Sequence, residues 1–175
     1  TYAVAVNGDV NEVIDPYVRA ATINGRRGVV IDLRSTDPSG WSKKKPVFSG
    51  KPTDALFYEL HVRDLSMDQS APFPDSVRGK FAALTIPNLK GKSNQPVGIA
   101  AIKDLGVTHL QILPIYDYAS VDESNPTFNW GYDPLNYIVP EGSYSSNPSD
   151  PKVRIIELKQ AIQALHNQGI RVVMD

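Results

Sequence analysis

The residues best suited to chemistry in this chain are concentrated in one stretch, at positions 128–134. Its sequence, Phe-Asn-Trp-Gly-Tyr-Asp-Pro, sets aromatic rings beside an amide and a carboxylate. A glycine that frees the backbone and a proline that restricts it indicate a defined loop. Flat rings next to hydrogen-bonding groups suit a sugar, because a pyranose has an apolar face and an edge of hydroxyl groups. The same residues also fit an aromatic-rich turn packed on a core, and the stretch alone does not separate these interpretations.

The composition of the chain excludes several other kinds of site. Its 175 residues suffice for one medium domain, or for a small domain joined to part of a larger one. A net charge of −1 gives no electrostatic footprint for nucleic acid, and no apolar run reaches the length of a membrane-spanning helix. The absence of cysteine excludes disulfides and thiolate metal sites, and no pair of histidines has metal-ligand spacing. We therefore expect neither nucleic acid nor a membrane among the partners, and no metal site built from cysteine or histidine.

The elements that must position the aromatic stretch begin with a β-rich segment at residues 1–34. Val4 and Val6 lie in an alternating run that ends at an Asn-Gly turn signal. A second Asn-Gly pair, at 24–25, precedes an apolar run at 28–33. The pattern predicts two hairpins. So short a segment cannot form a stable β domain by itself, and we therefore expect the last strands of a small antiparallel module.

Residues 54–175 follow an α/β pattern, after a linker-like stretch at 35–53 whose lysine run at 43–45 predicts a solvated face. Apolar runs predict three strands, and apolar residues three or four apart predict two helices between them. The strands are expected at residues 55–62, 107–113 and 170–174, and the helices at 99–105 and 153–167. Since the helices serve as crossovers, the strands should be parallel neighbours. Long segments after strands and short ones after helices are typical of a (β/α)8 barrel, whose active site is built from the loops that follow the strands.

Polar side chains alternate with apolar ones along the first two of these strands. The apolar face should meet the helices, which turns Glu59, His61, Arg63, His109 and Gln111 toward the barrel axis. A polar interior must be satisfied internally or by a ligand. We expect Glu59, His61 and His109 to be satisfied buried residues and not catalytic groups.

Four stretches, in chain order, resemble the first third of the catalytic barrel of α-amylase-family glycoside hydrolases. They are residues 58–66, 106–114, 129–134 and 172–175. The Asn-Trp-Gly-Tyr-Asp-Pro stretch is similar to the signature of type I pullulanases, in which a tyrosine usually stands at the position of Phe128. Residues 15–17, 24–25 and 29–33 are similar to the end of the carbohydrate-binding β-sandwich that precedes the barrel in pullulanases, isoamylases and branching enzymes. The resemblance implies a sandwich end at 1–34, a linker at 35–53, and three strands and two helices of a (β/α)8 TIM barrel at 54–175.

The activity implied by the resemblance is retaining hydrolysis of α-1,6 branch links in α-glucans such as pullulan, amylopectin and limit dextrin. That chemistry needs an aspartate nucleophile and a glutamate acid/base about 5–5.5 Å apart. In the family these carboxylates follow the fourth and fifth strands, so no catalytic residue is assigned to this chain. Three strands cannot close an eight-stranded barrel. We therefore expect the chain alone to be inactive and marginally stable, and to need the remainder of the same enzyme as its partner.

The resemblance also implies roles for five residues. Tyr132 matches the tyrosine that stacks under the sugar just before the cleaved bond, and Asn129 and Asp133 are polar members of the same loop. Asp133 also suits the orientation of a neighbouring side chain, and Trp130 suits packing, so each of these two keeps two interpretations. Asp175 matches the first aspartate of the family's Asp-x-x-x-Asn-His motif, which implies that it holds active-site arginine and histidine partners in place.

Three further questions stay open at this point. An isoamylase-like glycogen debranching enzyme, or a non-catalytic carbohydrate-binding module, would share parts of the pattern. Calcium is left open by the resemblance, but no acidic cluster in the sequence defines a site, and Asp68, Asp117 and Asp122 are scattered loop acids expected to be solvated. A polymeric substrate favours an extracellular location in a bacterium.

Overall fold

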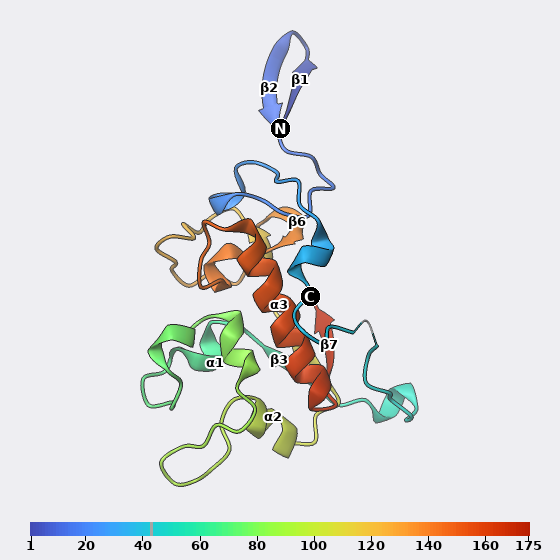
Figure 1. Ribbon diagram of the computed structural model, residues 1–175, viewed down its shortest axis with the longest axis vertical. Helices are drawn as coiled ribbons and strands as arrows, with labels where there is room; N and C mark the ends of the chain where they lie inside the picture. The colour runs from blue at the N-terminus through green and yellow to red at the C-terminus, as the bar shows by residue number, and fades with distance from the viewer. Residues whose placement is uncertain (43) are drawn as a thin grey trace.

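The computed structural model describes residues 1–42 and 44–175, and in these residues it shows a mixed α/β chain with three small sheets (Figure 1). Two of the sheets are antiparallel pairs, and the third is a parallel sheet of three strands. Lys43, which opens the predicted lysine run, lies outside the described residues. The longest helix runs beside the parallel sheet, and one antiparallel pair projects away at the N-terminal end (Figure 1).

The parallel sheet has the strand order β3-β4-β7. Its strands are β3, Phe57–Leu60, β4, His109–Ile112, and β7, Arg171–Met174. The register pairs Tyr58 with Leu110, and Leu110 in turn with Val172. The crossovers carry the helices α2, Ile99–Asp104, and α3, Pro151–Asn167. The parallel pairing and both helices predicted from the apolar pattern are confirmed, and the strands are shorter than predicted.

The ends of α3 follow from the residues that flank it. The Asp150 carboxylate accepts a hydrogen bond from the Lys152 N–H, and Pro151 occupies the first helical position. Gly169 has a φ of +81°, a conformation that glycine adopts without strain, and the chain turns there into β7. These signals fix where the helix starts and stops, and its length carries the chain back to the start of the sheet.

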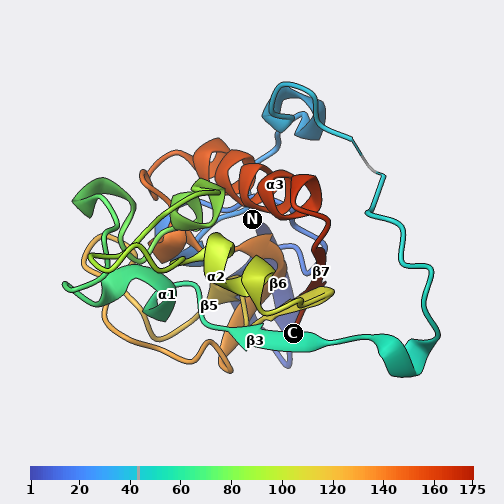
Figure 2. The same ribbon diagram turned by 90° about the horizontal axis from the view of Figure 1, so that it is seen from below.

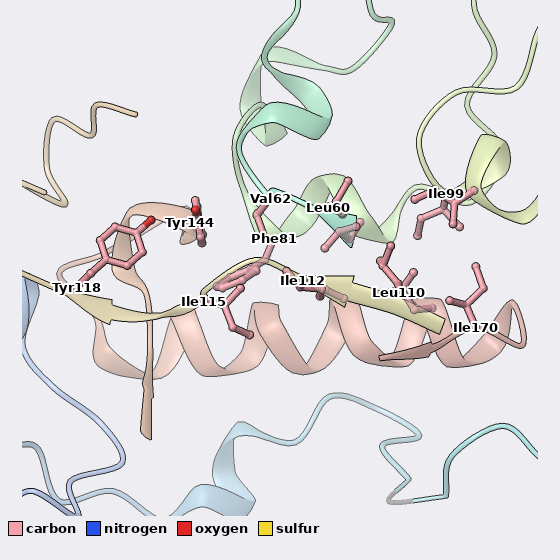
Figure 3. Packing of buried hydrophobic residues seen from close by; sticks show 14 of the residues in the cluster. Leu60, Val62, Phe81, Ile99, Leu110, Ile112, Ile115, Tyr118, Tyr144 and Ile170 are labelled. Atoms are coloured by element: carbon pink, nitrogen blue, oxygen red, sulfur yellow. The ribbon is translucent and has the colours of Figure 1, made fainter. Parts of the chain in front are cut away.

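The hydrophobic core lies between α3 and one face of the parallel sheet (Figure 3). Leu110 and Ile112 of β4 are fully buried there, together with Phe81 from the connection between β3 and β4. Ile99 of α2 and Leu165 of α3 are also fully buried and belong to the same cluster. Each such side chain contributes about 1.5–3 kcal/mol when it is fully buried. The core therefore fixes the sheet against α3 and leaves the ends of the strands free to carry other residues.

Short helical turns occupy the long connections of the sheet. They are α1, Asp64–Met67, and the 3-10 turns η4, Asp75–Val77, η5, Phe81–Thr85, and η6, Gly142–Tyr144. Arg78 fastens the first connection, since its guanidinium donates to the carbonyl oxygens of Ser66, Asp68 and Ala71 at 2.7–2.8 Å. The first connection is thus held by its own hydrogen bonds.

The connection after β4, in which the apolar pattern predicts no strand, contains an antiparallel pair of strands. These are β5, Tyr116–Tyr118, and β6, Pro134–Pro140. The register shifts on both sides of Asp117, and such an irregularity hides the pair from a search for strict alternation. The aromatic stretch at 128–134 leads directly into β6, so the two strands hold the ends of the loop that contains it.

The N-terminal segment matches only part of its prediction. The first hairpin is confirmed as β1, Tyr2–Val6, paired with β2, Asp9–Val13. The second is confirmed only as a turn: Ala21 and Gly28 form an antiparallel bridge around η1, Ile23–Gly25, but the predicted strands on either side are absent from the described residues. Asn24 and Gly25 instead bond to the region of β5 and β6: the Asn24 N–H donates to Glu123, and the Gly25 carbonyl accepts from Asn136. We call Asn24 and Gly25 the docking turn, because they attach the N-terminal segment to the β5–β6 region.

The described residues between η2, Leu33–Thr36, and η3, Pro52–Asp54, form no strand and run around the outside of the molecule (Figure 2). Lys159 of α3 holds the start of this stretch by donating to the Leu33 carbonyl and to Asp37. The parallel sheet is open, and no closed barrel is present among the described residues. None of the described helices is long and apolar enough to cross a membrane.

Candidate functional site

The candidate site lies where the aromatic loop meets the carboxyl end of the parallel sheet. Asp175 follows β7, and its N–H donates to the Ile112 carbonyl at 3.1 Å, which holds it at the sheet edge. The Tyr132 hydroxyl donates to Asp175 Oδ2 at 2.8 Å, although the two residues are 43 positions apart. The structure therefore brings together two residues whose roles were predicted from separate motifs.

An aromatic depression of about 460 Å³ surrounds this pair. It is lined by Pro114, Tyr116, Gly131, Tyr132, Pro134, Tyr137 and Asp175. The Tyr132 and Tyr137 side chains are 62% and 68% exposed, so their rings are accessible from solvent. Exposed rings beside a carboxylate can bind a pyranose, with the ring on its apolar face and the carboxylate on its hydroxyl groups.

The hydrogen bond to Asp175 also affects the ionisation of Tyr132. It raises the pKa of the Tyr132 phenol above its ordinary value, chiefly because the proton is shared with a carboxylate. The phenol therefore stays protonated and keeps donating to Asp175. The bond also fixes the orientation of the ring.

Asn129 and Asp133 point into the loop itself. The side-chain amide nitrogen of Asn129 donates to Ser120 Oγ at 2.7 Å, and its side-chain oxygen, Oδ1, accepts from the Gly131 N–H at 2.8 Å. Asp133 Oδ2 accepts from the Ser120 N–H at 3.0 Å and from the Ser120 hydroxyl. Ser120 thus closes the loop from both sides, which the sequence pattern did not indicate. Direct contact of Asn129 or Asp133 with a sugar stays a prediction, and orientation of the loop is the role that these bonds support.

The remaining aromatic residues of the stretch pack edge to face. The Phe128 and Trp130 rings lie 5.5 Å apart at 83°, and Trp130 is 59% exposed. Gly131 follows with a φ of +88°, and a Cβ there would stand 2.9 Å from Pro114 Cβ. Only glycine allows this close approach, which turns Tyr132 back toward the sheet.

His61 lies beneath the loop, with a side chain that is 5% exposed. Its Nε2 is 2.9 Å from the backbone carbonyl oxygen of Asn129, so His61 is a satisfied buried residue, as predicted. The same prediction is wrong for Glu59, which is exposed because the sheet is open on that side. Its carboxylate accepts a long hydrogen bond from the Gln111 amide, at 3.4 Å. His109 is half-buried and stacks on Phe57 with a 4.8 Å centroid distance.

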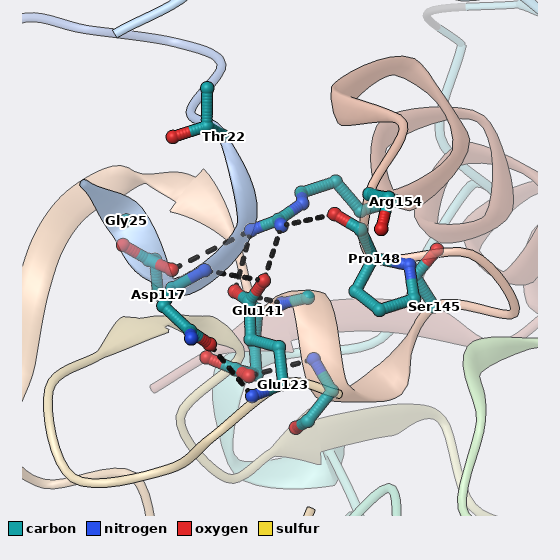
Figure 4. Close-up of polar contacts among 12 residues, drawn as sticks. Thr22, Gly25, Asp117, Glu123, Glu141, Ser145, Pro148 and Arg154 are labelled. Atoms are coloured by element: carbon teal, nitrogen blue, oxygen red, sulfur yellow. Dashed lines mark hydrogen bonds and ion pairs between the residues drawn. The ribbon is translucent and has the colours of Figure 1, made fainter. Parts of the chain in front are cut away.

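A second polar cluster lies between β5, β6 and α3 (Figure 4). We define the carboxylate cluster as Asp117, Glu123, Glu141 and Arg154, all of which are buried. The three carboxylates have oxygens within 4.8 Å of one another, and Arg154 Nη2 lies 2.6 Å from Glu123 Oε2 and Nη1 3.5 Å from Asp117 Oδ1. The prediction of Asp117 as a solvated loop acid is therefore wrong, because β5 turns its side chain inward. The sequence contains one indication of this cluster. Arg154 lies at helical spacing before Leu158, Ala161 and Leu165, which places a charged side chain on the buried face of α3.

The carboxylate cluster is a poor fit for a metal ion. Both oxygens of Glu123 already accept hydrogen bonds from the Arg154 guanidinium. Those of Glu141 accept from the N–H groups of Tyr118 and Ser143. The positive charge is supplied by Arg154, which would repel a cation. Burial raises the pKa of Asp117 to about 7 and also raises the pKa of Glu141, so a proton is the cation that this cluster favours.

Comparison with known proteins bears on the family of the chain. A pullulanase of Bacillus subtilis is 41% identical over 191 aligned positions, which cover 99% of this chain and 26% of that protein. A crystal structure of a pullulanase from Paenibacillus barengoltzii in complex with maltohexaose and α-cyclodextrin matches with a TM-score of 0.93 and 51% identity, over 99% of this chain and 27% of that one. The chain corresponds to a segment of a pullulanase-family protein.

A further pullulanase structure, from Bacillus acidopullulyticus, agrees with this assignment at a TM-score of 0.92 and 44% identity, over 99% of this chain and 21% of that one. No family model matches the chain. The chain spans about a quarter of the length of the pullulanases that it matches. The family assignment therefore covers all of the regions described above, while the activity of a whole pullulanase depends on more than these residues.

Proposed function

We propose that this chain is part of an enzyme that hydrolyses α-1,6-glucosidic branch links in pullulan and branched starch or glycogen, with retention of configuration. The observation that carries the proposal is the exposed Tyr132 ring, oriented by Asp175 at the carboxyl end of a parallel sheet. Active sites of parallel α/β folds form at this edge. Tyr132 provides the stacking surface for one glucose unit, Asp175 supports it, and Asn129, Trp130 and Asp133 shape the loop.

The proposed partner of the chain is the remainder of the same enzyme, which would complete a (β/α)8 barrel. The support is the apolar surface that the open sheet leaves uncovered. Met174 of β7 and Ile138 of β6 are about half exposed, at 47% and 48%, beside a depression of about 400 Å³ that Leu158 also lines. Covering such a surface with further strands is the expected solution for a parallel sheet. Residues 54–175 are then the first part of the barrel, residues 1–34 the end of a β-sandwich, and residues 35–53 the linker.

The proposal assigns binding, and not bond cleavage, to the residues described here. The retaining mechanism requires a nucleophile and an acid/base about 5–5.5 Å apart. The carboxylate cluster cannot serve as this pair, because its members are withdrawn from solvent and already bonded to Arg154 and to backbone N–H groups. We therefore place both catalytic carboxylates in the remainder of the enzyme.

The test is an assay of two polypeptides, the protein that carries this segment and the 175-residue chain alone. The first should release reducing ends from pullulan as α-anomers, and the second should be inactive. Faster action on glycogen than on pullulan would favour the isoamylase-like alternative. Binding of maltotriose without hydrolysis of either polymer would favour a carbohydrate-binding module. Hydrolysis of pullulan by the short chain would contradict the assignment of the catalytic residues.

A further inference from the structure

We propose that His61 is a positioning residue for the sugar-binding loop, and that it acts through the backbone carbonyl of Asn129. This inference rests on the proposed function of Tyr132. His61 is at the carboxyl end of β3, whereas the loop belongs to the connection between β5 and β6. The imidazole therefore ties the loop to the parallel sheet at a point three residues before Tyr132.

Three separate segments meet around the His61 ring. The ring lies 5.1 Å from Phe128 at a tilt of 35°, and 6.0 Å from Tyr144 at a nearly perpendicular angle. Its Nε2 is 2.9 Å from the Asn129 carbonyl oxygen and 3.2 Å from the Tyr144 hydroxyl. These two aromatic contacts restrict the orientation of the ring. The hydrogen bond can then hold the loop at one distance from the sheet.

The chemistry of the partners determines which nitrogen of His61 carries the proton. A carbonyl oxygen can only accept, so the bond to Asn129 requires a proton on Nε2. The other nitrogen, Nδ1, lies 3.4 Å from the Asp64 N–H and 3.8 Å from Asp64 Oδ1. The contact with Asn129 depends on the proton on Nε2 alone. His61 is thus a donor to the loop, and a side chain that merely fills the same volume would leave the part-buried Asn129 carbonyl without this donor.

The effect of this bond should reach the sugar through Tyr132. Ser120 closes the loop internally through Asn129 and Asp133 but does not attach it to the sheet. His61 provides that attachment, while Asp175 orients the far end of the Tyr132 side chain. Loss of the His61 bond would let the loop move relative to Asp175. Binding of a sugar depends on the ring being held in place before the ligand arrives.

The experiment uses the protein that carries this segment and compares two substitutions at one position. In His61→Gln the amide nitrogen is as many bonds from Cβ as Nε2 is in histidine, so it can still donate to the Asn129 carbonyl. In His61→Asn the amide nitrogen is one bond closer to Cβ and does not reach it. We expect His61→Gln to bind maltotriose within about threefold of the wild type and His61→Asn to bind about tenfold more weakly. For pullulan, the loss should appear mainly in KM. Calorimetry with maltotriose measures the first effect, and steady-state kinetics the second.

A double substitution shows whether His61 acts through Tyr132. Once Tyr132→Ala has removed the ring, His61→Asn should weaken maltotriose binding no further. Equal binding by the Gln and Asn variants, or an unchanged loss in the Tyr132→Ala background, would overturn the positioning role. A wild type that binds maltotriose but cleaves no α-1,6 link would refute the proposed activity alone, since the binding measurement still decides on His61. A wild type that does not bind maltotriose would overturn both.

Discussion

The carboxylate cluster and the Tyr132–Asp175 pair use similar groups in opposite settings. In the cluster, Arg154 and Glu123 are withdrawn from solvent and bonded at 2.6 Å. At the candidate site, Tyr132 and Asp175 are exposed and bonded at 2.8 Å. A buried charge must be paired within the protein, whereas an exposed acceptor can exchange its partner for a ligand. The comparison teaches that burial, more than residue type, separates a structural polar group from one that can bind substrate.

The two regions are also connected through the chain. Glu123 accepts from the Asn24 N–H of the N-terminal docking turn and from Arg154 of α3. It belongs to the same β5–β6 connection as Tyr132. The carboxylate cluster thereby holds three segments against one another, and the aromatic loop extends from the connection that it fixes. A rigid buried anchor beneath an exposed loop is the arrangement expected of a preorganised binding site.

The largest expected effect comes from removing the cation of the carboxylate cluster. Arg154→Met keeps an apolar stem but leaves three buried carboxylates without their positive partner. We expect the free energy of unfolding to fall by about 3–5 kcal/mol. Urea unfolding followed by circular dichroism measures the change. Lys152→Met, on the exposed side of the same helix, is the control and should stay within about 0.5 kcal/mol of the wild type. Equal losses in the two variants would show that the cluster contributes no special stability.

The docking turn offers a second test of the buried region. A Cβ at Gly25 would lie 2.7 Å from Leu135 Cδ2 and 2.8 Å from Asn136 Nδ2, and it would also contact Asp117. Gly106 has a similar φ, +73° against +61°, but no atom within 4 Å of its Cβ position. Gly106→Ala should therefore cost about 1 kcal/mol from backbone strain alone. Gly25→Ala should cost about 2 kcal/mol more from crowding, measured by the same unfolding experiment. Similar losses in both variants would mean that the turn adapts without disturbing β6.

The dependence of stability on pH distinguishes the two regions further. Burial raises the pKa of Asp117 to about 7 in the folded chain, so the folded state holds this proton more tightly than the unfolded state does. The resulting stabilisation is complete below the ordinary pKa of an aspartate, about 4, and is lost as the pH rises toward 7. Glu141 contributes with the same sign. Asp117→Asn should flatten the fall in unfolding free energy across this window, by up to about 1.4 kcal/mol per pH unit. A variant with the slope of the wild type would place the bound proton elsewhere.

The smallest effect on stability is expected at the candidate site. Tyr132→Phe removes an exposed hydrogen bond to Asp175 and should change the free energy of unfolding by less than about 1 kcal/mol. Tyr132→Ala removes the ring as well and should weaken maltotriose binding about tenfold. Thermal unfolding and calorimetry on the same samples separate the two readouts. A large loss of stability in Tyr132→Phe would mean that the pair is structural, like the carboxylate cluster, and would remove the contrast between the two regions.

The parts of the fold that could be predicted depend on neighbours in the chain. Leu110 and Ile112 share one face of β4 by simple alternation, and Asp150 with Pro151 marks the start of α3. β5 and β6 escaped prediction because the register shifts beside Asp117 break the alternation. Glu59 was expected in a closed polar interior, and it is exposed because the described sheet is open. The residues of the candidate site were proposed from their motifs, whereas Ser120 has no local pattern that marks it.

The parallel strands, the two crossover helices, the aromatic loop and its likeness to pullulanases can all be read from the sequence. These features follow from the period of apolar residues, from helix-end signals and from short motifs, all of which act over a few residues. That Glu123 meets Arg154 across 31 residues, and Tyr132 meets Asp175 across 43, becomes visible only in the folded chain. Burial and charge pairing depend on groups that folding brings together. The same aspartate is therefore solvated or buried according to whether a strand turns it inward.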